Sequence, residues 1–193
     1  LQPGQTLNLT AEDVAMLAKH QTSVCACPTT ERNLGDGILP ADQLLAAQVS
    51  MAVGTDSEVQ ISPLEDVRQL EYHLRLRDLK RAVLDTQGGA VDGLAATLYR
   101  IASEGGMRAL QWPGGALRPG EPADFIAIDR GDPSIAGAST EDLLANVVFS
   151  MERTAIQEVY VAGNAIVRNG ATGLEEEVLP AFATTMGRLW GMS

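Results

Sequence analysis

Along the first third of the chain, short apolar runs alternate with segments in which apolar residues have helical spacing. Residues 23–27 and 51–53 are small, partly β-branched runs that stop at a proline and at a glycine, which is typical of short buried strands. Between them, residues 40–48 place leucine and alanine at helical spacing. A strand, a loop, a helix and a second strand within residues 23–55 have the order and length of a parallel βαβ unit. The pattern therefore predicts an α/β fold with a parallel sheet.

Helical spacing continues on either side of this unit. Thr10 and Asp13 form a capping-box pattern that begins a short helix. After a Ser-Pro step, leucine and valine recur with a helical period in a longer segment, and Arg68 falls on the side that we expect to face solvent. A third helix is predicted over residues 90–103. We expect the glycine pair at residues 105–106 to end it.

Turn signals and short β-prone runs dominate the second half of the chain. Residues 107–170 therefore predict a small β domain. Ala-Gly-Asn at residues 162–164 suits a tight hairpin turn, and one helix capped by Ser139 or Thr140 interrupts the strands. Residues 174–190 predict a C-terminal helix.

Composition limits the partners of the chain. The 193 residues are 45% hydrophobic, enough for a real core, and carry a formal net charge of −11. This acidity argues against nucleic acid or an anionic membrane as a partner. No apolar stretch approaches the length of a membrane span, and the N-terminus lacks a signal-peptide pattern. We therefore expect a cytoplasmic protein.

The two cysteines lie two positions apart on a predicted strand. Side chains at Cys25 and Cys27 would leave from one face with poor geometry for a mutual disulfide. We interpret them as reduced, buried strand residues. Half of a zinc site is the alternative, but no other cysteine and no nearby histidine completes it.

Asp56 is the strongest candidate for chemistry. It follows a predicted parallel strand, and (β/α) barrels place their chemistry at the carboxyl ends of strands. A carboxylate there could ligate a divalent metal or act as a general base. The alternative is a turn or helix cap before Ser57.

The segment 28–37 is the second candidate. Its glycines give backbone freedom, and its threonines, Glu31, Arg32 and Asn33 offer hydrogen-bonding groups at the same end of the sheet as Asp56. We expect a loop that binds a small polar substrate, or else a glycine-punctuated turn.

The order and spacing of several motifs resemble the formimidoylglutamate deiminases of the metal-dependent amidohydrolase superfamily. The motifs are Cys-Pro-Thr-Thr-Glu at 27–31, Asn-Leu-Gly-Asp-Gly at 33–37, Gly-Thr-Asp-Ser at 54–57 and Leu-Glu-Tyr at 70–72. The resemblance is strong over residues 9–84 and looser beyond. It implies the C-terminal portion of a (β/α)8 TIM barrel plus a small β-sandwich.

In terms of this resemblance, the chain divides into three parts. Residues 1–106 are a partial barrel segment, residues 107–173 a β-sandwich-like domain and residues 174–193 a C-terminal helix. Asp56 takes the place of the family's metal-binding, catalytic aspartate, and Glu31 and Ser57 lie near the substrate. The intact family holds zinc or another divalent metal.

The histidines of the family's site are missing from this chain. The family uses several histidines on other strands, whereas this chain has two, His20 and His73, at unrelated positions. Asn8 stands where the sixth-strand histidine would fall, and it cannot shuttle a proton near neutral pH. We therefore expect no catalytic metal and no activity from this chain alone.

Two hypotheses follow. In the first, the chain is part of an enzyme that hydrolyses N-formimino-L-glutamate to N-formyl-L-glutamate and ammonia. In the second, it is a non-catalytic assembly or interaction module derived from an amidohydrolase. Either way, the incomplete barrel implies a homo-oligomer or a complementing chain that covers the bare strands.

Overall fold

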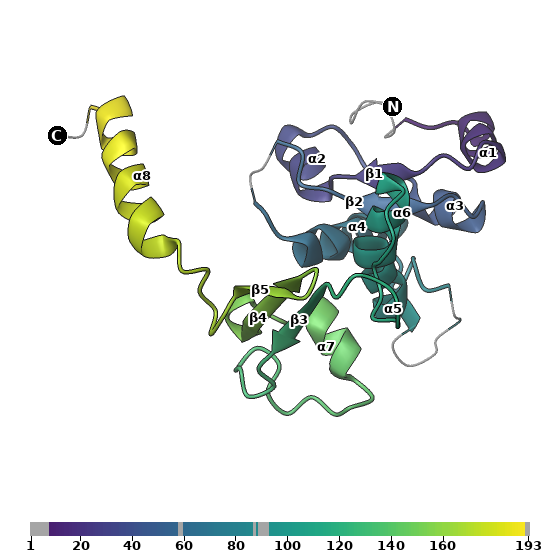
Figure 1. Cartoon of the computed structure of the whole chain (residues 1–193). Coiled ribbons are helices and arrows are strands. Elements are labelled where there is room, and N and C mark those ends of the chain that lie inside the picture. Colours follow the sequence, from purple (N-terminus) through teal and green to yellow (C-terminus); the bar gives the residue numbers. More distant parts are fainter. Residues whose placement is uncertain (1–7, 58–59, 87, 89–92, 192–193) are drawn as a thin grey trace.

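The computed structural model describes residues 8–57, 60–86, 88 and 93–191, and its strands form two separate sheets (Figure 1). The first sheet is a parallel pair of β1 (Val24–Ala26) and β2 (Met51–Val53). In its register, Val24 lies opposite Met51 and Ala26 opposite Val53. The predicted parallel βαβ unit is therefore confirmed.

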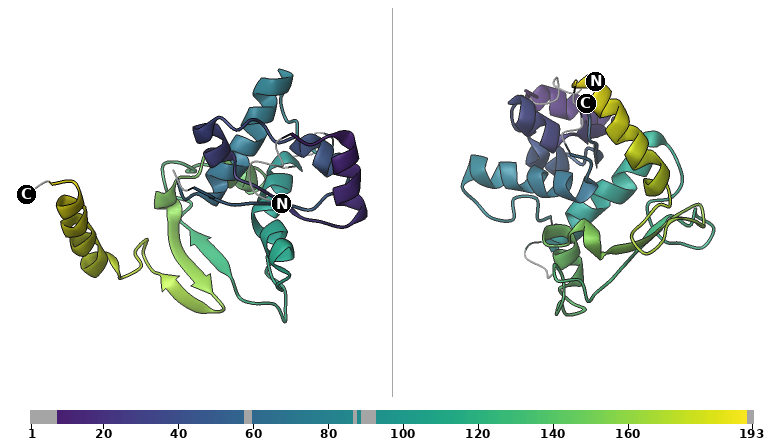
Figure 2. Two further views of the ribbon diagram at one scale, coloured as in Figure 1. Left: turned by 90° about the horizontal axis from the view of Figure 1, so that it is seen from above. Right: turned by 90° about the vertical axis from the view of Figure 1, so that its left-hand side faces the viewer.

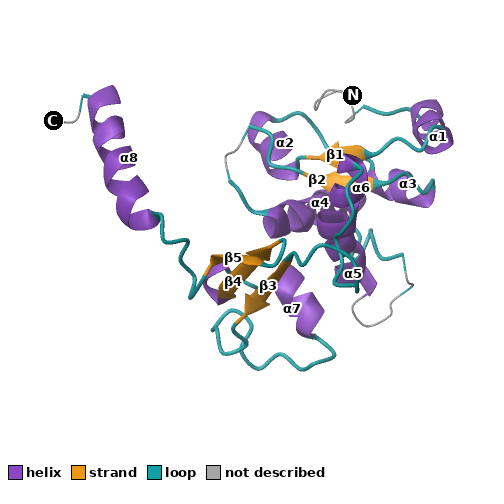
Figure 3. Ribbon diagram, viewed as in Figure 1, coloured by secondary structure: helices purple, strands orange, loops and turns teal. Residues whose placement is uncertain are grey.

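Helices surround this pair, as Figure 3 shows by colour. The capping box predicted at Thr10 is present, because Thr10 Oγ1 accepts from the Asp13 amide at 3.2 Å and the Asp13 carboxylate accepts from the Thr10 amide at 2.9 Å. The helices of this part are α1 (Ala11–Lys19), α2 (Pro28–Leu34), α3 (Ala41–Ala46), α4 (Pro63–Asp78) and α5 (Gly93–Arg100).

One apolar core joins these elements. It combines residues of both strands with residues of α1, α3, α4 and α5, and the helix α7 (Leu143–Phe149) from the second half of the chain adds Val148. Leu44, Leu74 and Leu98 are completely buried in it. Burial of such leucines stabilises a fold by about 1.5–3 kcal/mol each.

The glycine pair does not end the helix that precedes it. A π-helical turn, η2 (Ile101–Gly105), follows α5 directly, and α6 (Gly106–Leu110) continues from it. The helix ends instead at Gln111, whose φ is 56°. A Cβ on Gly105 would lie 2.0 Å from the Met51 carbonyl oxygen, so this glycine permits close packing of the helix on β2.

The second sheet is antiparallel and contains β3 (Phe125–Ile128), β4 (Ile156–Val161) and β5 (Asn164–Val167), in that order. The predicted hairpin turn is confirmed, since Ala162 and Gly163 both have positive φ, 48° and 77°. Among the described residues, this part of the chain has one three-stranded sheet, so the second layer of the expected β-sandwich is not observed.

Arg68 links the two halves of the chain and is not on a solvent face as predicted. Its Nη2 donates to the Met151 carbonyl at 2.7 Å and its Nε donates to the Val148 carbonyl at the end of α7. The short 3-10 helix η3 (Arg153–Ala155) follows. The sequence placed Arg68 on the polar side of α4, and only the packing of α7 against that side partly buries it.

The C-terminal helix α8 (Glu175–Leu189) confirms the helix expected there and stands away from the rest of the ribbon in Figure 1 and in the left-hand view of Figure 2. It exposes large apolar side chains, among them Phe182 and Leu189. Among the described residues, no helix is both long and apolar enough to cross a membrane.

Candidate functional site

Asp56 lies just beyond the carboxyl end of β2 and is exposed. Its φ of 42° is in the left-handed region, which non-glycine residues rarely adopt. Backbone strain of this kind is about 1–3 kcal/mol and concentrates at functional sites. The turn therefore presents a carboxylate to solvent at the edge where both parallel strands end.

The helix α2 holds the backbone next to Asp56. Thr30 Oγ1 donates to the Thr55 carbonyl at 2.8 Å, and the Gly54 amide donates to the Ala26 carbonyl at 2.9 Å. These two bonds tie the segment after β2 to α2 and to β1. The position of Asp56 therefore depends on the segment that the sequence marked as the second candidate.

That segment is mainly a helix and not the loop that we expected. Pro28 takes the first helical position, where its missing amide hydrogen is harmless, and Gly35 ends α2 with a φ of 73°. Both signals are visible in the sequence, but the short length of the helix and its glycine-rich end favoured a loop. Glu31 lies within α2.

Glu31 is buried, and its Oε1 accepts from the Cys27 amide at 2.9 Å, which caps the start of α2. Burial raises the pKa of Glu31, and the nearby negative charges of Asp66, Asp36 and Asp56 raise it further. Glu31 and Asp56 are therefore close enough to interact electrostatically. Ser57 follows Asp56 and is exposed, so the three predicted site residues lie at one edge of the sheet.

Asp66 lies near the candidate site, against α2, and the sequence did not single it out. It is completely buried on α4, and its Oδ1 accepts from the Thr29 hydroxyl at 2.8 Å and from the Thr29 amide at 3.2 Å. Its Oδ2 has no hydrogen-bond partner, and burial raises its pKa. In the sequence, an aspartate in the first turn of a helix indicates only a favourable helix-dipole interaction.

Glu71 was noticed only as part of a motif, and the structure gives it a structural role. It is completely buried and accepts from Arg75 Nε at 2.7 Å and from the amides of Val83 at 3.0 Å and Leu84 at 2.9 Å. It therefore fixes the turn after α4.

The histidines lie in helices away from any cluster of ligands. His20 ends α1 and is exposed, while His73 is half-buried on α4, where burial lowers its pKa. Within the described ranges, no group of three or more His, Cys, Asp and Glu side chains could hold a metal ion. A catalytic zinc takes about three protein ligands and a water. The described residues therefore do not fit a catalytic metal by themselves.

The cysteines are both free thiols, but only Cys27 is buried, so the prediction was wrong for Cys25, which is exposed. Val24 and Ala26 point into the core, while Cys25 points to the opposite face of the sheet. In a strand, alternate residues occupy opposite faces, and this face is not covered at Cys25.

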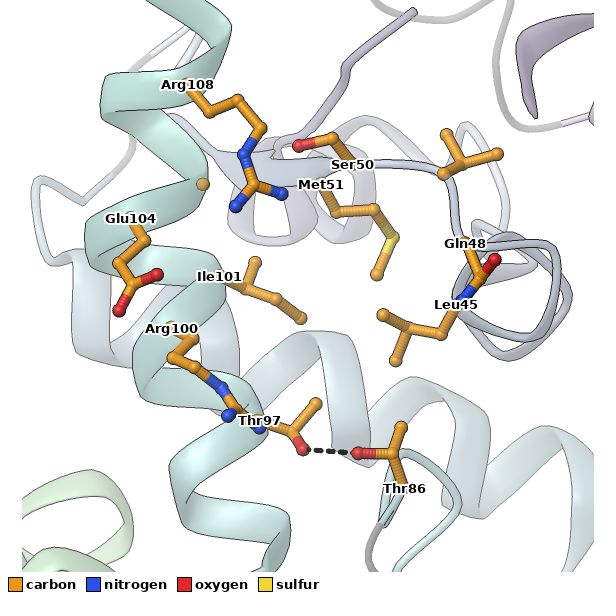
Figure 4. Close-up of a pocket in the computed structure, with 12 residues that line it drawn as sticks. Leu45, Gln48, Ser50, Met51, Thr86, Thr97, Arg100, Ile101, Glu104 and Arg108 are labelled. Carbon is orange, nitrogen blue, oxygen red and sulfur yellow. Dashed lines mark hydrogen bonds between the residues drawn. The ribbon is translucent and has the colours of Figure 1, made fainter. Parts of the chain in front are cut away.

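A cavity of about 380 Å³ lies at the other end of β2, where Ser50 and Met51 meet the α5–η2–α6 helix. Figure 4 shows Arg108 extending toward Ser50 and Met51, whereas Glu104 points away from them. Barrel enzymes place their chemistry at the carboxyl ends of strands. This cavity is therefore separate from the candidate site at Asp56.

Known proteins resemble this chain in sequence over most of its length. A family model described as "Amidohydrolase family" matches residues 1–166. Formimidoylglutamate deiminase of Pseudomonas aeruginosa is 39% identical over 177 residues, which are 92% of this chain and 39% of the relative. A 5-methylthioadenosine/S-adenosylhomocysteine deaminase of Thermococcus sibiricus is 26% identical over 82% of this chain and 36% of that protein.

Solved structures extend the comparison to the fold. An amidohydrolase from Brucella melitensis gives a TM-score of 0.83 at 30% identity, over 96% of this chain and 40% of that one. An adenosine deaminase from Xanthomonas campestris, solved with bound zinc, gives 0.80 at 24% identity. The chain thus spans less than half the length of these relatives. The likeness supports a TIM-barrel-type hydrolase fold.

Proposed function

Because the chain belongs to the amidohydrolase family, we propose that it supplies the C-terminal part of a cytoplasmic deaminase-type active site for N-formimino-L-glutamate. The reaction would hydrolyse the formimino group and yield N-formyl-L-glutamate and ammonia. The observation that carries the proposal is the placement of Asp56, exposed with a strained backbone at the carboxyl end of a parallel strand. The likeness to the Pseudomonas aeruginosa deiminase supports the choice of substrate.

Each predicted site residue has a role in this proposal. Asp56 would be one of several metal ligands in the complete enzyme, and its carboxylate could accept a proton from the attacking water. Ser57 and Glu31 lie beside the substrate, and Glu31 also caps α2 through the Cys27 amide. Thr30 positions Asp56 through the Thr55 carbonyl. The remaining ligands have to come from outside the described residues.

The experiment that tests this proposal adds the part of the active site that the described residues lack. We would fuse this chain, with Asn8→His to restore the sixth-strand histidine that the resemblance implies, to the N-terminal part of the Pseudomonas aeruginosa deiminase that it does not match, and measure ammonia release. We expect release from N-formimino-L-glutamate and not from S-adenosylhomocysteine. Asp56→Asn should lower the rate by about 10²–10⁴-fold, as loss of a general base does, while Glu141→Gln, at an exposed carboxylate, should leave it unchanged.

Other results would contradict the proposal in different ways. Release from S-adenosylhomocysteine alone would assign the chain to the substrate of its other relatives. A folded fusion protein that releases ammonia from neither compound would favour the non-catalytic assembly module. Activity that survives Asp56→Asn would remove Asp56 from the site.

A further inference from the structure

Two thiols converge on one point beside the candidate site. Cys25 is the middle residue of β1, and Cys27 follows the strand directly as the residue before α2. Gly54, on the segment that continues β2, lies opposite them. A Cβ on Gly54 would be 3.1 Å from Cys25 Sγ and 3.6 Å from Cys27 Sγ. Both sulfurs therefore border the small space that the absent side chain leaves open.

A metal ion can reach this pair of thiols. Cys25 is exposed, so the pair is accessible from solvent. A thiolate is the form that ligates metals. Asp56 and Glu31 lie near enough to oppose thiolate formation, and a bound cation would relieve this repulsion.

We propose that Cys25 and Cys27 bind one Cu(I) ion as a pair of thiolates. Two Cu–S bonds form, two thiol protons are released and no electron is transferred. Thiolates are soft ligands that select Cu(I). Zinc normally takes four ligands in a structural site, and the described part of the chain offers no third His, Cys, Asp or Glu to this pair. This site is distinct from the divalent metal position assigned to Asp56.

The test is an anaerobic titration of this chain with Cu(I) in competition with a chromogenic Cu(I) chelator. We expect one Cu(I) per chain. Cys25→Ser and Cys27→Ser should each weaken binding by more than about 100-fold, because even residues that only support a metal ligand contribute about 10–100-fold. Met16→Leu removes an exposed thioether on α1 and should leave the affinity unchanged.

Gly54→Ala tests the geometry without removing a ligand. The added methyl group would occupy the space between the sulfurs, and we expect weaker Cu(I) binding while both thiols still react with a thiol reagent in unfolded protein. Circular dichroism would verify that each variant folds. Wild-type affinity in both serine variants, one Cu(I) per two chains, or no binding against the chelator would each overturn the proposal.

Discussion

At the scale of single residues, the candidate site contains a carboxyl group in an unfavourable environment. Asp66 is completely buried, receives two hydrogen bonds from Thr29 on one oxygen, and has no partner on the other. Burial raises its pKa because desolvation disfavours the charged form. The folded state therefore binds a proton more tightly than the unfolded chain does.

This linkage predicts how Asp66 affects stability as the pH changes. The stabilising contribution is complete below the ordinary carboxyl pKa and is lost as the pH rises through the raised pKa. In urea denaturation, we expect the free energy of unfolding of wild type to fall relative to that of Asp66→Asn as the pH rises from the ordinary carboxyl pKa to the raised pKa of Asp66. The matched variant Glu12→Gln, at an exposed carboxylate on α1, should show no such trend. A constant difference between wild type and Asp66→Asn across this range would mean that Asp66 titrates normally.

At the scale of elements, two adjacent glycines in one continuous helix have opposite surroundings. Gly105 and Gly106 both have helical backbone angles. A Cβ on Gly105 would collide with the Met51 carbonyl oxygen, whereas a Cβ on Gly106 would have nothing within 4 Å. The helix packs on β2 through the first glycine only.

This contrast predicts opposite effects of one substitution. Gly105→Ala should destabilise the fold by about 3 kcal/mol or more. The new methyl group would collide with the Met51 backbone, which cannot move aside as a flexible side chain can. Gly106→Ala should stabilise it by about 0.5–1 kcal/mol, because alanine loses less backbone entropy in a helix. Chemical denaturation of the two variants measures both effects. Similar changes in both would mean that the helix does not pack closely on β2.

At the scale of the whole molecule, an acidic chain carries an exposed apolar helix. The formal net charge is −11, which opposes association of identical chains. Helical spacing places Val178, Phe182 and Leu189 on one face of α8, and all three are exposed. The glutamates of its first turn and Arg188 in its last turn would attract each other in an antiparallel pair.

We therefore expect the chain to self-associate through α8, and the earlier expectation of a homo-oligomer stays a prediction that light scattering tests. Phe182→Glu should weaken association by about ten- to a hundredfold, since burial of a phenylalanine contributes about 1.5–3 kcal/mol. Thr184→Glu adds the same charge on another face of the helix and is the control. A wild-type monomer at micromolar concentration would contradict this assignment.

The division of the chain into three parts also stays a prediction at this scale. The helix α6 crosses the boundary between residues 106 and 107, and Val148 of α7 enters the core of the first part. The second part also has a small buried cluster of its own, formed by Ile135, Val147, Met151 and Ala155. Arg68 further joins the first part to the end of α7.

The sequence by itself determined the features that depend on neighbouring residues. The capping box at Thr10, the two strands of the parallel pair, the helix after the Ser-Pro step and the turn at Ala162 and Gly163 are all as predicted. Each follows from short-range backbone geometry, from local hydrogen bonds or from apolar periodicity. The position of Asp56 just after a strand was predicted in the same way, because a strand end can be read from a strand pattern.

Only the tertiary structure decided which side chains are buried and which groups they contact. It brought Arg68 into hydrogen bonds at the end of α7, used Gly105 for close packing and not as a helix end, and left Cys25 exposed while Cys27 is buried. It also brought Asp66 to Thr29 across 37 positions of sequence. Periodicity reports which face of an element is apolar, but burial and hydrogen bonding depend on segments that meet only when the chain folds.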